Sequence, residues 1–178
     1  MSLSAEQMIF RAAREAREGE VAFLGGGLAT RIRRYLLPGV HVLQDEADGR
    51  KVDVAFVSAR KIRCRGELIS SARAGSETRC DCSTVPGCDA ARMVVLIPHT
   101  ADGEANIVEH SATSSGGDNG RPRRLIITDL ALLEVTEMGL VLRELAPGVS
   151  AREVQRVTGA LLLVGPDLIE MEIPHPLP

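Results

Sequence analysis

Runs of consecutive apolar residues place the strongest constraint on the fold of this chain. Met93–Ile97 reads MVVLI, Leu125–Ile127 is entirely apolar, and Val52–Val57 is interrupted only by Asp53. Successive side chains of a strand point to opposite faces, so a strand made of such a run must be covered on both faces. We therefore predict that these three strands lie side by side in one central sheet.

Segments with helical spacing alternate with these strands. From Ala5 to Arg17 apolar side chains recur at helical intervals, and Ser4 with Gln7 has the spacing of a capping box. By the same reasoning we predict helices over Ala29–Leu37 and Ala151–Val157, strands over Val21–Leu24, Val40–Leu43, Leu140–Leu145 and Leu161–Val164, a hairpin turning near Arg65–Gly66, and a long surface loop over Ser70–Asp89. This alternation predicts an α/β fold of three layers, in which a largely parallel sheet carries helices on both faces.

Size and composition narrow the class of protein. The chain has 178 residues, enough for one hydrophobic core, so we expect residues 1–178 to form a single domain. Its formal net charge of −3 and its 2% of aromatic residues argue against nucleic-acid binding, which relies on an excess of Lys and Arg and on base stacking. No apolar run approaches the roughly 20 residues needed to span a bilayer, and the stretch to Gly19 lacks the pattern of a secretory signal. We expect a cytoplasmic protein that engages neither nucleic acid nor membrane.

The cysteines allow two interpretations. Cys80, Cys82 and Cys88 lie close together, with Cys64 further upstream, and thiolates are the preferred ligands of structural zinc. The spacing differs from the usual C-x₂-C pair, so we expect free thiols and no bound metal, with a small zinc module as the alternative. The histidines show no pattern typical of acid–base catalysis, and we expect each to be a surface or hydrogen-bonded residue: His41, His99, His110 and His175.

Four segments resemble a known family. RRLIITDLALLEV and GLVLRELAPGVSAREVQRVTGALLLV are similar to the C-terminal block of the β subunits of family I coenzyme A transferases, in which a strand ending in Thr-Asp leads to a hairpin and a helix closes on Thr-Gly. KVDVAFVSARKIRCRGEL and GEVAFLGGGLATRIRRYL resemble earlier segments of the same family, including an opening glycine turn. The resemblance runs from the first helix to Val164. It implies the fold of the 3-oxoacid and glutaconate CoA transferases, with the chain as a β-type subunit shortened in its middle.

The resemblance also implies a chemistry. Active members use a glutamate just after a strand, in a Ser-Glu-Asn-Gly setting, whose carboxylate attacks an acyl-CoA thioester and ends as a glutamyl-CoA thioester. VHVLQDEADG occupies that place, and Glu46 is the residue that aligns with the nucleophile. The implied substrates are an acyl-CoA thioester and a small carboxylic acid, with no permanently bound cofactor. The implied partner is an α-type subunit, in a homo- or hetero-oligomer.

The residues around Glu46 depart from this pattern and keep a second interpretation open. Asp45 replaces the serine, Ala47 replaces the asparagine, and a glycine-rich stretch is missing before Lys51. Neighbouring acidic groups raise the pKa of a carboxylate and repel anionic substrates. The alternative is a catalytically degenerate paralogue that acts as a binding or structural subunit.

Two glycine segments are the predicted contacts for coenzyme A. Gly25, Gly26 and Gly27 lie between a strand and a helix, where backbone amides at a helix N-terminus favour anions. Gly87, in VPGCDAAR, matches part of the glycine loop that in the family lies against the pantetheine arm. Tight packing of the strand against the helix is the other explanation of the first three glycines.

Overall fold

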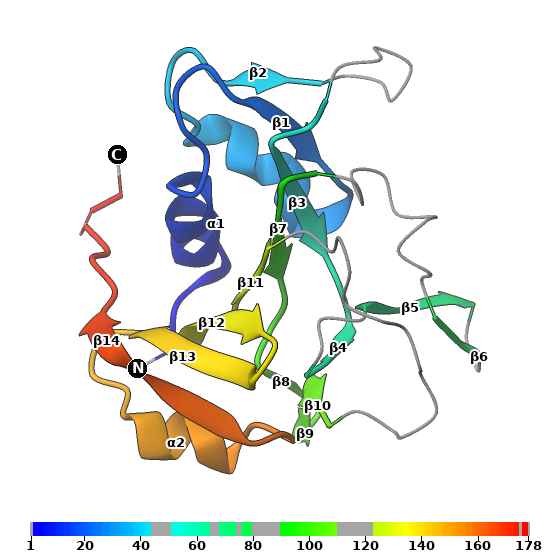
Figure 1. The fold of residues 1–178 in the computed structure, drawn as a ribbon, viewed down its shortest axis with the longest axis vertical. Helices are drawn as coiled ribbons and strands as arrows, with labels where there is room; N and C mark the ends of the chain where they lie inside the picture. The colour runs from blue at the N-terminus through cyan, green and yellow to red at the C-terminus, as the bar shows by residue number, and fades with distance from the viewer. Residues whose placement is uncertain are drawn as a thin grey trace.

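The computed structural model describes residues 2–43, 51–64, 68–73, 76–79, 90–109, 123–174 and 176–177. Along the chain the elements are α1 (Ala5–Ala13), β1 (Val21–Leu24), the 3₁₀ helix η1 (Gly27–Arg34), β2 (His41–Val42), β3 (Val54–Ser58), β4 (Lys61–Arg63), β5 (Leu68–Arg73), β6 (Ser76–Arg79), β7 (Arg92–Leu96), β8 (Thr100–Ala101), β9 (Glu104–Ala105), β10 (Ile107–Val108), β11 (Arg123–Ile127), β12 (Ala131–Thr136), β13 (Gly139–Leu145), α2 (Ala151–Arg156) and β14 (Leu162–Glu170). Figure 1 shows their arrangement.

An eight-stranded sheet in the order β14-β13-β12-β11-β7-β3-β1-β2 forms the centre of the molecule. The strands from β2 to β11 pair in parallel, β12 is antiparallel to both of its neighbours, and β14 is again parallel to β13. A smaller sheet has the order β10-β4-β5-β6. The three apolar runs become β3, β7 and β11, which are adjacent in the large sheet, so the prediction that they lie side by side is confirmed.

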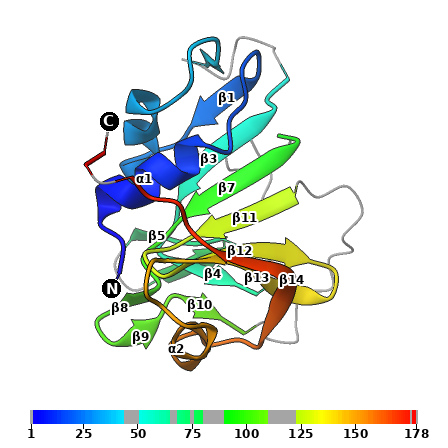
Figure 2. The same ribbon diagram turned by 90° about the vertical axis from the view of Figure 1, so that its left-hand side faces the viewer.

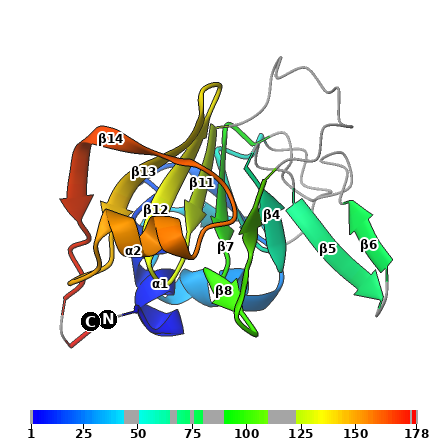
Figure 3. The ribbon, with the colours of Figure 1, turned by 90° about the horizontal axis from the view of Figure 1, so that it is seen from below.

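Both faces of the large sheet are covered. On the first face, Ile9 of α1 and Ile32 of η1 belong to one apolar cluster with Phe56 of β3. On the second face, Ile62 of β4 and Val154 of α2 share a cluster with strand residues such as Val95 and Ile126. Figure 2 shows α1 in front of the strands, and Figure 3 shows β7 between α1 and β4. The predicted three-layer α/β fold is confirmed, with the small sheet adding to the layer that contains α2.

The helix starts follow the sequence closely, whereas the end of α1 does not. Both capping boxes form, Ser4 with Gln7 and Ser150 with Glu153. The first helix ends at Ala13 instead of Arg17. The next backbone N–H groups, beginning with that of Arg14, bond to carbonyls three residues back, which tightens the chain out of the α-helix before it turns at Gly19.

Two other predictions require correction. The helix predicted over Ala29–Leu37 is the 3₁₀ helix η1, which starts at Gly27 and ends at Arg34. The long loop predicted over Ser70–Asp89 is wrong in its first part, because β5 extends to Arg73 and pairs with β6. That hairpin has few apolar residues and no clear alternation, so its backbone pairing leaves little trace in the sequence. The predicted hairpin near Arg65–Gly66 is confirmed by the antiparallel pairing of β4 with β5, and its turn lies outside the described residues.

Candidate active site at the carboxyl ends of the parallel strands

The carboxyl ends of β1, β3, β7 and β11 meet at one edge of the large sheet. Leu24 pairs with Phe56, and Ser58 pairs with Leu96, so these strands end at similar heights. Open α/β sheets bind ligands in the crevice beyond the carboxyl ends of their strands. The candidate site is therefore built from the segments that follow these strands, namely Gly25–Gly27, Ser58–Arg60, Pro98–His99 and Thr128–Asp129.

Gly25 allows the turn after β1 to lie against β3. Its N–H donates a hydrogen bond to the carbonyl of Phe56 at 2.7 Å. A Cβ atom at this position would lie 3.0 Å from the same carbonyl oxygen and 3.5 Å from the Cα of Val57. The absence of a side chain at Gly25 thus lets the two backbones approach, and its amide is already engaged inside the protein.

Gly26 and Gly27 form the exposed start of η1. Gly26 is the N-cap and has no side chain with which to cap the helix. Gly27 has a φ of +72°, a left-handed conformation that costs an L-residue about 1 kcal/mol or more. The first N–H groups of a helix have no partner within the helix, so this turn presents backbone donors at the carboxyl edge of the sheet.

Ser58 supplies the cap that Gly26 lacks. It ends β3, and its Oγ accepts a hydrogen bond from the N–H of Ala29 at 3.2 Å. A Cβ at Gly27 would lie 3.2 Å from both Cβ and Oγ of Ser58. The sequence analysis did not single out Ser58, because its role depends on a contact between the end of β3 and the start of η1, which are far apart in the sequence.

His99 contacts both motifs of the C-terminal block, the Thr-Asp pair after β11 and the Thr-Gly pair after α2. The imidazole is fully buried, with Nδ1 3.0 Å from Oγ1 of Thr128 and Nε2 2.8 Å from Oγ1 of Thr158. Its backbone N–H donates to Oδ1 of Asp129 at 2.8 Å. Thr128-Asp129 follows β11 and Thr158 lies just after α2, so this ring connects the carboxyl edge of the sheet to the second layer.

Burial controls the charge of this histidine. Desolvation lowers the pKa of His99 from 6.5 to about 4, and the nearby Asp129 carboxylate only partly opposes that effect. The ring is therefore neutral near pH 7. The sequence analysis expected a surface or hydrogen-bonded residue, and His99 is a hydrogen-bonded one. A signal for its burial was its place two residues after an entirely apolar strand.

The other predicted site residues fall outside the described residues. These are Glu46, with its neighbours Asp45 and Ala47, and Gly87. The chain that precedes Glu46 is described as far as Leu43, whose N–H bonds to the carbonyl of Ala22 on β1.

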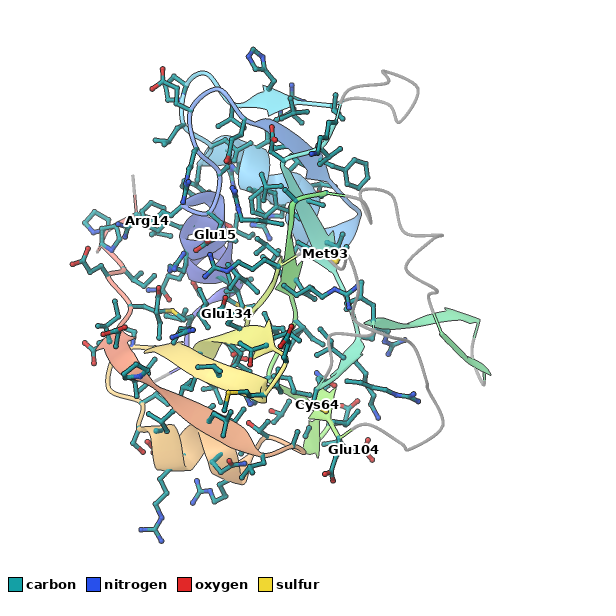
Figure 4. The ribbon with its side chains drawn as sticks, viewed as in Figure 1. Arg14, Glu15, Cys64, Met93, Glu104 and Glu134 are labelled. Carbon is teal, nitrogen blue, oxygen red and sulfur yellow. The ribbon has the colours of Figure 1, made fainter. Side chains whose placement is uncertain are left out.

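The cysteines Cys80, Cys82 and Cys88 also lie outside the described part of the chain. Cys64 is partly buried at the end of β4, and its N–H bonds to the carbonyl of Val108 on β10 (Figure 4). Within the described ranges, no group of His, Cys, Asp and Glu side chains is arranged to hold a metal ion. The same ranges contain no helix with the length and apolar character needed to cross a membrane.

Comparison with known proteins shows the fold. No protein-family model matches this chain. The decarboxylase AibA/AibB superposes with a TM-score of 0.68 at 21% identity, over 97% of this chain and 90% of the other. Glutaconate coenzyme A-transferase from Acidaminococcus fermentans gives a TM-score of 0.68 at 18% identity, over 97% and 90% of the two chains. The acyl-CoA transferase YdiF from Escherichia coli O157:H7 gives 0.69 at 17% identity, over 97% of this chain and 44% of the other.

This chain has the fold of two coenzyme A transferases and a decarboxylase. The superpositions cover nearly the whole chain, which confirms the fold that the sequence resemblance implied. They also show that the fold carries more than one reaction, so the chemistry has to be argued from the residues of the site.

Proposed function

We propose that this chain is a subunit of a coenzyme A transferase and that it moves coenzyme A between an acyl-CoA thioester and a small carboxylic acid. The observation that carries the proposal is the superposition of 97% of the chain on structures that include YdiF in a thioester complex with CoA. The residue-level resemblance in four segments supports it independently. Glu46 is the proposed nucleophile.

The proposed reaction needs only a carboxylate and the two substrates. A carboxylate oxygen of Glu46 attacks the thioester carbonyl carbon, the C–S bond breaks, and the CoA thiolate leaves behind an acyl-glutamyl anhydride. The thiolate then attacks the glutamyl carbonyl carbon, which releases the first acid and forms a glutamyl-CoA thioester. The incoming carboxylate repeats these steps in reverse order and leaves as the new acyl-CoA, with Glu46 regenerated. No electrons are gained or lost.

The glycine turn has a defined part in this proposal. Each attack places negative charge on a carbonyl oxygen, which backbone N–H groups stabilise when they are already in position. Gly26 and Gly27 are exposed at the start of η1 and can offer such donors. Gly25 contributes by keeping the turn close to β3, since its own N–H is bonded to Phe56. Gly87 is proposed to contact the pantetheine arm.

An α-type subunit is the proposed partner. This chain covers 44% of the YdiF chain, so more than half of that protein has no counterpart here. A second chain could supply the remaining wall of the pocket and so take part in selecting the substrate. Acyl-CoA and the accepting acid would then bind between the two subunits.

A degenerate paralogue is the second candidate, and the residues around Glu46 favour it. Asp45 and Asp48 add negative charge beside the proposed nucleophile, where they repel an acid substrate and the phosphates of CoA. AibA/AibB, a decarboxylase of the same fold, is a precedent for this architecture serving a different purpose. In this candidate the chain keeps the fold and its contacts with partner subunits while transfer has been lost.

Trapping of the glutamyl thioester distinguishes the two candidates. The purified chain, alone and with an α-type subunit, is incubated with a panel of short-chain acyl-CoA thioesters and then with borohydride, which reduces a glutamyl thioester to an alcohol. Mass spectrometry of the peptide that contains Glu46 should show the loss expected for this conversion. Glu46→Gln should abolish the loss, since an amide cannot form the anhydride.

Glu104→Gln is the matched control, because the Glu104 side chain is 74% exposed on β9 and its known partner is Lys61. This variant should trap like the unmodified chain. No trapping across the panel, with no binding of CoA, would remove the transferase and leave the degenerate paralogue.

A further inference from the structure

No described helix covers the first face of the large sheet over β13 and β14. Figure 2 shows α1 in front of β3 and β7, whereas no described helix lies in front of β13 and β14. A groove of about 640 Å³ opens there, lined by Thr136, Glu137, Met138, Val141, Arg143, Leu163, Val164, Gly165 and Pro166. We call this surface the β13–β14 groove.

Large apolar side chains are concentrated around this groove. Met138 is 84% exposed at the β12–β13 turn, and Val164 is 61% exposed on β14. Leu161, just before β14, and Ile169, near the other end of the strand, are also exposed, and Ile169 lines a separate groove beside Arg11. Of the five large apolar side chains that the structure describes as exposed, four lie on or beside β14, and Met138 and Val164 are the two that line the groove. Such a concentration at one edge of a sheet marks an interaction surface.

The free edge of β14 is shaped against addition of another strand. Among the described strands, β14 pairs only with β13 and is the last strand of the large sheet. Its register against β13 shifts between Leu142 and Glu144, and Pro166 lies within it. A proline and an irregular pairing are features that prevent edge-to-edge association. The partner must therefore contact the side chains of the groove and not the backbone of the edge.

We infer that the β13–β14 groove is where a second copy of this chain docks, with Met138 of each copy inserted into the groove of the other. The surface contains both a projecting apolar side chain, Met138, and a hollow bounded by Val141, Leu163 and Val164. A two-fold axis brings the same surface of both copies together, so Met138 of each copy can enter the hollow of the other.

The charges in the groove are self-complementary as well. Glu137 is exposed at its rim, and Arg143 lines its floor with a side chain that is 35% exposed. Arg143 binds Glu134 through its Nε, and the same side chain lines the groove. A two-fold axis can place Glu137 of each copy against Arg143 of the other, and a patch with both signs of charge tolerates contact with itself. This inference does not rest on the proposed transferase activity.

The mass of the purified chain in solution tests the inference. Sedimentation velocity up to about 200 µM, well above the dissociation constants of specific interfaces, should give the mass of two chains. Met138→Asp and Val164→Asp should each weaken the dimer roughly tenfold or more, because each would bury a carboxylate in the contact. Both side chains are exposed in the single chain, so far-UV circular dichroism should not change, and neither should the unfolding midpoint at a concentration low enough to keep the chain monomeric.

Leu37→Asp is the matched control, since Leu37 is 54% exposed and lies away from the groove. This variant should dimerise like the unmodified chain. The mass of a single chain at the highest concentration would overturn the inference. Occupation of the groove by a different protein, with the chain itself monomeric, is one such case. So would a dimer that Met138→Asp and Val164→Asp leave unchanged.

Discussion

His99 is expected to make the stability of this protein fall as the pH is lowered from 7 to 5. In the unfolded chain the imidazole takes up a proton near its ordinary pKa of about 6.5, whereas in the folded chain burial holds that pKa at about 4. Between these values the unfolded state binds more protons than the folded state. The free energy of unfolding therefore rises with pH in this window. The contribution of His99 to that free energy is fully present above pH 6.5 and is lost as the pH falls toward 4.

The magnitude follows from the two pKa values. A pKa difference of this size corresponds to about 3 kcal/mol in total, of which about 2 kcal/mol lies between pH 7 and pH 5. Burial by itself would raise the pKa of carboxylates such as Glu20 and Glu134, but hydrogen bonds from arginines outweigh it and lower both pKa values. These carboxylates take up protons mainly below pH 5, so their contribution is small between pH 7 and pH 5, where the effect of the histidine is measured.

Urea denaturation at a series of pH values measures the effect. The chain has no Trp, so far-UV circular dichroism is the suitable signal. His99→Gln keeps one donor and one acceptor but removes the titration, so it should lower stability at pH 7 and flatten its dependence on pH. His41→Gln, at an exposed position on β2, is the control for replacing a histidine that is not buried.

An equal slope in the unmodified chain and in His99→Gln would refute this reasoning. Thr158 donates its hydroxyl to the carbonyl of Val154, so its Oγ1 can accept from Nε2–H of His99. Oγ1 of Thr128 already accepts from the N–H groups of Leu130 and Ala131, so it has no lone pair left for a proton on Nδ1. An equal slope would mean that the acceptor at Thr158 and the Asp129 carboxylate together outweigh burial and keep His99 charged in the folded protein.

Two further predictions concern packing and charge. Gly25→Ala should lower the free energy of unfolding by about 1–3 kcal/mol, because its Cβ would lie 3.0 Å from the carbonyl oxygen of Phe56. Gly26→Ala is the control and should change stability little, because no atom lies within 4 Å of its Cβ. Equal losses in urea denaturation would contradict this account. Arg11→Met should cost about 2–3 kcal/mol, because it leaves the largely buried Glu144 without its ion-pair partner. Arg14, which neighbours Glu15 in Figure 4, pairs with the exposed Glu172 at 3.9 Å, so Arg14→Met should cost close to nothing, and thermal unfolding of the two variants checks the difference.

The candidate site was predictable in its position but not in its detailed contacts. The glycines at Gly25–Gly27 and the strand before them are adjacent in the sequence, so their place at a strand-to-helix turn could be inferred directly. Ser58 reaches Ala29 across 29 residues of chain, and His99 reaches Thr158 across 59. No local pattern encodes such contacts, since they depend on which strands become neighbours and in what register. Glu46 and Gly87 remain predictions.

The sequence by itself determined the elements whose signals are contiguous. Apolar runs specified β3, β7 and β11, and capping boxes specified the starts of α1 and α2, because hydrophobicity and a cap act over a few neighbouring residues. Only the tertiary structure decided the strand order, the hairpin of β5 and β6, and the burial of His99 between Thr128 and Thr158. These features form when distant segments pack together, and the energy that selects them comes from burial and hydrogen bonding between those segments.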